Sequence, residues 1–138
     1  MSLNVALLRM KIEKINESLE RLKRIRNVSL PDFLNNQDLK DIACFRLLIV
    51  IEDALAVCFH ISAKNLKRIP TEYGECFRIL AHEGIVPKDL AERLSLMARF
   101  RNVLVHQYWD VDFKRVYAII KEDLGHIEAF LESIEKLL

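Results

Sequence analysis

The sequence contains little of what builds turns and sheets. Its 138 residues include only three glycines and three prolines, which leaves few positions for hairpins or long irregular loops. No segment alternates polar and apolar residues over the length of a strand, whereas apolar residues recur at three- and four-residue steps along most of the chain. Together these features predict an all-α protein, and the length predicts a single domain over residues 1–138.

An excess of charge of one sign is also absent, since 21 basic residues face 20 acidic ones and the net charge is +1. Because a field that attracts nucleic acid or membranes requires a strong imbalance, such a contact would have to come from a local patch. The basic residues at 21–26 form one such group. We interpret them as a solvated face that complements the C-terminus of the first helix, with phosphate contact as the alternative.

Long hydrophobic runs are missing. The most apolar stretch, residues 42–59, contains Arg46, Glu52 and Asp53, so it is interpreted as a buried helix of a soluble protein and not as a membrane span. Charged residues within 9–14 interrupt the N-terminal region, which therefore lacks the pattern of a signal peptide. We expect a cytoplasmic protein without membrane association.

Cysteines are few and scattered. Cys44, Cys58 and Cys76 contain no C-x-x-C pair, and their odd number and wide spacing argue against a disulfide framework or a zinc site. The expectation is three buried, reduced thiols.

Signatures of metal and phosphate-loop enzymes are absent as well. Three glycines cannot build a P-loop, and the sequence has no H-E-x-x-H. A di-metal carboxylate bundle requires two Glu-x-x-His motifs, and the sequence offers a single Asp-x-x-His, from Asp123 to His126. His60 and His82 have no ligand partner at a suitable spacing. No metal and no cofactor is predicted.

The apolar stripes predict four long helices and one short helix in an up-and-down bundle. The expected ranges are about 4–26, a second helix from Asn35 or Asn36 to about 65, a short third helix from about 70 to Gly84, a fourth from Pro87, and a fifth from Asp110 or Asp112 to 138.

The stretch RFRNVLVHQYWDVD at residues 99–112 departs from this plain pattern. Arg101 falls on the core-facing stripe of the fourth helix. Because a guanidinium group stays charged, it must be paired or must face a wet cleft. One interpretation is a structural ion pair with an acid of the second long helix, either Glu52 or Asp53.

His106 follows Arg101 by five residues, so on a continuous helix their side chains are separated by about 140°. Either the helix distorts between them or a second subunit completes the site. Asn102 shares a face with His106 and is placed to orient its ring. A histidine for proton transfer, an arginine for phosphate and the hydroxyl of Tyr108 are components for metal-free phosphodiester chemistry. Trp109 is expected to bury its ring at a helix junction, with stacking on a base as the alternative.

The segment RNVLVHQY, residues 101–108, resembles the R-x4-H-x-Y motif of HEPN domains, specifically that of the HepT-like toxin family. The acid that follows LLIVI and the connection EYGECFRILAHEGIVPKDLAERL are similar to the same family. The resemblance implies a HEPN helical bundle and a homodimer with the motif at its interface. It also implies metal-independent RNA cleavage by Arg101, His106 and Asn102.

The resemblance further implies a partner, an MntA-type minimal nucleotidyltransferase antitoxin that inhibits the toxin by adding AMP to the motif tyrosine, here Tyr108. Glu52 matches an acidic position of the family's second helix, and Asp53 is its neighbouring candidate. Two other functions stay open. The chain is alternatively a non-catalytic nucleotide-binding or accessory subunit of a nucleotidyltransferase, or a structural dimer in which Arg101 is a pairing residue that needs neither His106 nor Tyr108.

Overall fold

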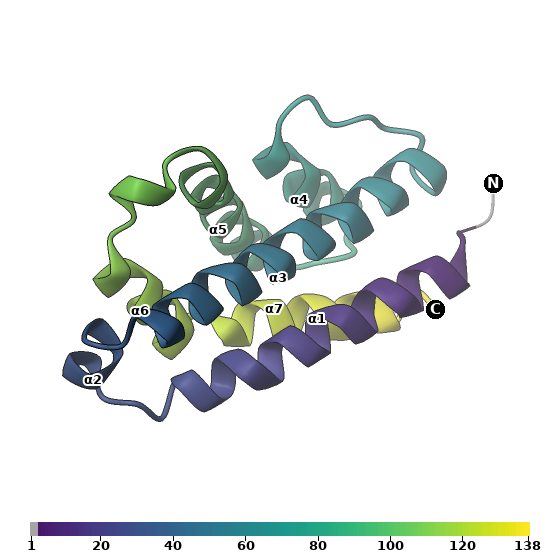
Figure 1. Cartoon of the computed structure of the whole chain (residues 1–138). Helices are drawn as coiled ribbons and strands as arrows, with labels where there is room; N and C mark the ends of the chain where they lie inside the picture. Colours follow the sequence, from purple (N-terminus) through teal and green to yellow (C-terminus); the bar gives the residue numbers. More distant parts are fainter. Residues whose placement is uncertain (1–2) are drawn as a thin grey trace.

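The computed structural model describes residues 3–138, apart from the side chain of Tyr73, and these residues form helices and connecting loops without a strand. The elements are α1 (Val5–Ile25), α2 (Leu30–Leu34), α3 (Gln37–Lys64), α4 (Tyr73–His82), α5 (Lys88–His106), the 3-10 turn η1 (Tyr108–Asp110), α6 (Phe113–Glu122) and α7 (Leu124–Glu135) (Figure 1). The all-α prediction is confirmed. No helix in the described part of the chain is long and apolar enough to span a membrane.

The predicted division of the chain into helices was wrong at two places. The expected ranges contained no helix between residues 26 and 35, whereas Pro31 occupies the first turn of the short helix α2, which Ser29 caps. The predicted last helix is divided into α6 and α7 at Asp123. Ile120 and Leu124 are both buried on either side of this break, so the apolar spacing continues and conceals it.

Three of the predicted helix starts are confirmed by their caps. The side chains of Asn4, Asn36 and Asp112 each accept a hydrogen bond from a backbone N–H of the first turn of α1, α3 and α6. Gly84 follows α4 with a φ of 75°, the left-handed conformation that glycine adopts most easily at the end of a helix. Polar caps and this glycine therefore position the helix ends.

The long helix α3 is the centre of the bundle, because it packs against α1, α4 and α5. Figure 1 shows α1, α3 and α7 running along the length of the molecule. Two ion pairs join α1 to α7: Arg9 to Glu135 at 3.4 Å and Lys23 to Glu128 at 3.1 Å. The second of these places part of the basic end of α1 in contact with its neighbouring helix.

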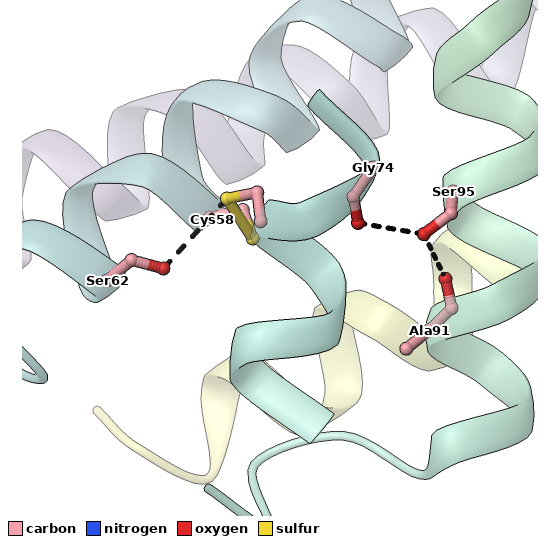
Figure 2. Close-up of a disulfide and its surroundings, with 6 residues drawn as sticks. Cys58, Ser62, Gly74, Ala91 and Ser95 are labelled. Atoms are coloured by element: carbon pink, nitrogen blue, oxygen red, sulfur yellow. Dashed lines mark hydrogen bonds between the residues drawn. A yellow bond between two sulfur atoms is a disulfide. The ribbon is translucent and has the colours of Figure 1, made fainter. Parts of the chain in front are cut away.

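The expectation of three reduced cysteines was wrong for two of them. Cys58 of α3 and Cys76 of α4 form a disulfide (Figure 2). Their Cα atoms are 6.0 Å apart, the usual separation for a disulfide, because α4 packs directly on α3. Sequence spacing cannot reveal such an inter-helix contact. Cys44 is buried and free, and burial raises the pKa of its thiol to about 11.

A close contact fixes α4 against α5 beside the motif. The hydroxyl of Ser95 on α5 lies 2.9 Å from the carbonyl oxygen of Gly74 and 2.8 Å from that of Ala91 (Figure 2). A Cβ atom at Gly74 would lie 3.4 Å from the Cβ of Ser95, at the limit of ordinary van der Waals contact, so the two helices pack closely at this point.

Candidate functional site

The motif occupies the last turns of α5 and the 3-10 turn that follows. Helix α5 continues through His106 and ends there. The side chain of Arg101 is 18% exposed, whereas Asn102 and His106 are exposed. Arg101 and His106 therefore have different surroundings, as their angular separation on a continuous helix predicted.

Arg101 is held by an acid of α3. Its Nε atom donates to Glu52 Oε1, and its Nη1 atom donates to Asn102 Oδ1 at 3.3 Å. Asp53 instead accepts from Lys11 of α1 at 3.4 Å, so the structure brings Glu52 and not Asp53 to Arg101. The Glu52 side chain is 44% exposed. The pair is therefore half-buried, and Glu52 holds the Arg101 guanidinium at the edge of the solvent.

Tyr108 is fixed by a carboxylate that the sequence analysis missed. Its hydroxyl donates to Asp41 Oδ1 at 2.7 Å, and Gln37 donates to the same oxygen at 2.9 Å. The hydrogen bond to Asp41 raises the pKa of Tyr108 to about 12 and holds the pKa of Asp41 below its usual range. The phenol is therefore protonated at neutral pH and points toward α3.

The partners of Arg101 and Tyr108 lie on one stripe of α3. Asp41, Phe45, Leu48 and Glu52 follow one another at steps of four, three and four residues, which places them on the same helix face. The acid spacing Asp41 to Glu52 was a signal in the sequence that could have identified Asp41. Along this stripe, the N-terminal part of α3 meets η1 and the middle of α3 meets α5.

Large apolar side chains surround these contacts and are not covered by this chain. We define the apolar patch as the exposed side chains of Ile42, Phe45, Val105, Tyr108 and Trp109. Phe45 is 58% exposed and Trp109 is 80% exposed. The predicted burial of Trp109 at a helix junction was wrong, because Trp109 lies in the short turn η1, whose residues are not buried.

The remaining histidine candidates have ordinary partners. His60 accepts from the backbone N–H of Asn4 at 3.1 Å, and His126 lies 3.6 Å from Asp123. Within residues 3–138, no three His, Cys, Asp or Glu side chains are grouped so that they could hold a metal ion.

The chain is similar in sequence to two nucleases named HepT. The chain is 27% identical over 128 residues to the tRNA nuclease HepT of Aphanizomenon flos-aquae, with 93% of this chain and 87% of the relative covered. It is 26% identical over 126 residues to the mRNA nuclease HepT of Shewanella oneidensis, with 90% and 95% covered.

The fold has a solved counterpart in the tri-AMPylated HEPN toxin of Shewanella oneidensis in complex with MNT antitoxin. The TM-score is 0.86 at 22% identity, over 94% of this chain and 97% of that one. A family model described as ribonuclease HepT-like matches residues 15–134, which include the whole motif. The chain therefore belongs to the ribonuclease HepT-like family.

Proposed function

We propose that this chain is a metal-independent ribonuclease toxin that cleaves RNA with Arg101 and His106 as its catalytic residues. One observation carries the proposal: an arginine anchored by Glu52 lies on α5 five residues before an exposed histidine at the end of the same helix. Family membership adds support, because two relatives are named tRNA nuclease and mRNA nuclease. Guanidinium and imidazole are the groups that phosphodiester cleavage requires when no metal takes part.

The proposed reaction is an attack of the RNA 2′-hydroxyl on the adjacent phosphorus. A bond forms between O2′ and phosphorus and the bond to the 5′ oxygen breaks, which gives a cyclic phosphate and a free 5′-hydroxyl. His106 takes the proton of the 2′-hydroxyl or returns one to the leaving oxygen. Arg101 stabilises the negative charge that gathers on the phosphoryl oxygens. Asn102, whose oxygen accepts from Arg101, presents its amide N–H groups to the phosphate or to His106.

A second copy of the chain would complete the site. Arg101 and His106 are about 140° apart on α5, but in a twofold dimer the arginine of one protomer can lie opposite the histidine of the other. The apolar patch supports this arrangement, because its five large side chains are exposed on this chain and exposed apolar surface often marks an interface between proteins. Phe45 and Val105 belong to this patch, and Val105 lies one turn after Arg101.

Replacing Phe45 with glutamate is expected to convert the dimer into a monomer and to abolish cleavage, because a buried unpaired carboxylate opposes association. Light scattering after size-exclusion chromatography measures the mass of the particle. Leu96→Glu is the matched control, since Leu96 is an exposed apolar residue of α5, half a turn away from the face of Val105. A wild-type chain that is a monomer at all concentrations would contradict the composite site.

The catalytic proposal is tested by incubating the purified protein with RNA in excess chelator. We expect cleavage without a divalent metal, and a requirement for Mg²⁺ would exclude the proposed mechanism. Arg101→Ala should be inactive, whereas Arg93→Ala, at an exposed arginine of the same helix, should cleave normally. Absence of cleavage together with Arg101-dependent binding of labelled nucleotide would favour the accessory-subunit alternative.

We also propose regulation by an MntA-type nucleotidyltransferase, since a structurally similar toxin is tri-AMPylated and bound to an MNT antitoxin. Tyr108 is the acceptor in this proposal, because it is the tyrosine of the motif and is 41% exposed. Transfer forms a bond between the tyrosine oxygen and the α-phosphorus of ATP and releases pyrophosphate. The AMP group on Tyr108 places bulk and negative charge at the proposed site of Arg101 and His106 and so repels RNA.

A further inference from the structure

A groove of about 510 Å³ opens between α3, α4 and α5. Its walls include Phe59 of α3, Arg78 of α4, and Arg99 and Asn102 of α5. Asn102 belongs to both this groove and the motif, so the two regions adjoin. Nothing in the proposed cleavage step uses Phe59, Arg78 or Arg99.

The groove continues the surface that holds the motif. On α3, Phe59 follows Glu52 by seven residues, which is two turns along the same face and about 10 Å along the axis. On α5, Arg99, Asn102 and His106 follow one another at steps of three and four residues, so they share a face as well. Arg99 therefore lies two turns before His106 on the same side of α5.

The side chains of the groove suit a nucleotide of RNA. Arg99 is exposed. Arg78 Nε donates to Glu92 at 3.1 Å, which fixes its guanidinium, and its Nη1 atom lies 3.7 Å from the position of a Cβ at Gly74, in the groove wall. Guanidinium groups are well suited to bind phosphate, and the groove offers two of them. The half-buried ring of Phe59 is a surface on which a base can stack.

We propose that this groove binds an RNA nucleotide that flanks the scissile phosphate, with Arg99 and Arg78 on its phosphate and Phe59 against its base. The inference rests on the proposed ribonuclease function and extends it from the reacting atoms to the neighbouring part of the substrate. The lining holds two arginines and one acid, Glu72. Since Glu92 already pairs with Arg78, Arg99 is the main cation for the phosphate.

The test compares steady-state cleavage of a single-stranded RNA oligonucleotide by Arg99→Ala, Phe59→Leu and the wild type. Losing one charge-assisted contact raises KM by roughly tenfold, and losing a stacking surface raises it by about fivefold or more, with kcat unchanged in both. The dependence of KM on salt concentration becomes shallower in Arg99→Ala, because one phosphate contact is lost. Arg99→Lys restores most of the salt dependence, since it retains the charge.

Arg93→Ala is the control, because Arg93 is an exposed arginine on another face of α5. Wild-type KM and salt dependence in both groove variants overturn the inference, and so does a fall in kcat alone. RNA binding by the slowly cleaving His106→Ala protein, followed by fluorescence anisotropy, separates this proposal from the catalytic one. Arg99-dependent binding without any wild-type cleavage supports the groove and overturns the ribonuclease; a wild-type chain that neither binds nor cleaves RNA overturns both.

Discussion

The His106→Ala variant is expected to cleave RNA about 10²- to 10⁴-fold more slowly than the wild type, the contribution typical of a general acid or base. His106 is the last residue of α5 and is exposed. Substitution of an exposed residue usually changes stability by less than about 0.5 kcal/mol, so the loss should not come from unfolding. The rate constant for cleavage in excess chelator and the thermal midpoint of unfolding are the two measurements.

His82→Ala provides the control, since His82 is the last residue of α4 as His106 is of α5. This variant should cleave like the wild type. The dependence of the rate on pH gives a second readout: the limb that reports the imidazole should disappear from the residual activity of His106→Ala. Unchanged cleavage and an unchanged pH profile in a folded His106→Ala protein would remove this residue from the mechanism.

Local patterns in the sequence were sufficient for most of the fold. Caps at Asn4, Asn36 and Asp112 are properties of a few neighbouring residues, and so is the stripe that places Arg101 toward α3. The sequence also narrowed the partner of Arg101 to Glu52 or Asp53. Consecutive residues on a helix point about 100° apart, so only one of the two can face α5, and the packing of α3 against α1 assigns Asp53 to Lys11.

Contacts between helices were harder to predict from the sequence. The hydrogen bond from Tyr108 to Asp41 joins residues 67 positions apart, and it depends on how η1 turns back toward the start of α3. The disulfide from Cys58 to Cys76 likewise depends on how α4 meets α3. Periodicity reports which face of a helix is apolar, but it contains no information on which neighbour covers that face or where two helices cross.

Replacing Tyr108 with phenylalanine is expected to reduce AMP incorporation by the MntA-type partner to background and to leave the toxin active in its presence. The substitution retains the ring and removes the oxygen that attacks the α-phosphorus of ATP. Mass spectrometry of the toxin after incubation with the partner and ATP measures incorporation, and RNA cleavage by the same samples measures inhibition. The matched control is Tyr117→Phe. The hydroxyl of Tyr117 donates to the backbone oxygen of Val28, away from the motif.

The contact with Asp41 explains why AMP on Tyr108 should change the position of this side chain and not only block the site by its bulk. The free phenol donates to the Asp41 carboxylate, whereas an AMPylated tyrosine has no proton to donate and brings a negative phosphate toward a negative carboxylate. Like charges at this distance repel, so the modified side chain should leave α3 and move toward the cation of Arg101. Asp41→Asn removes the repulsion, and we expect it to retain AMPylation but to show weaker inhibition per AMP group. Equal inhibition of fully modified Asp41→Asn and wild-type toxin would show that bulk alone blocks the site.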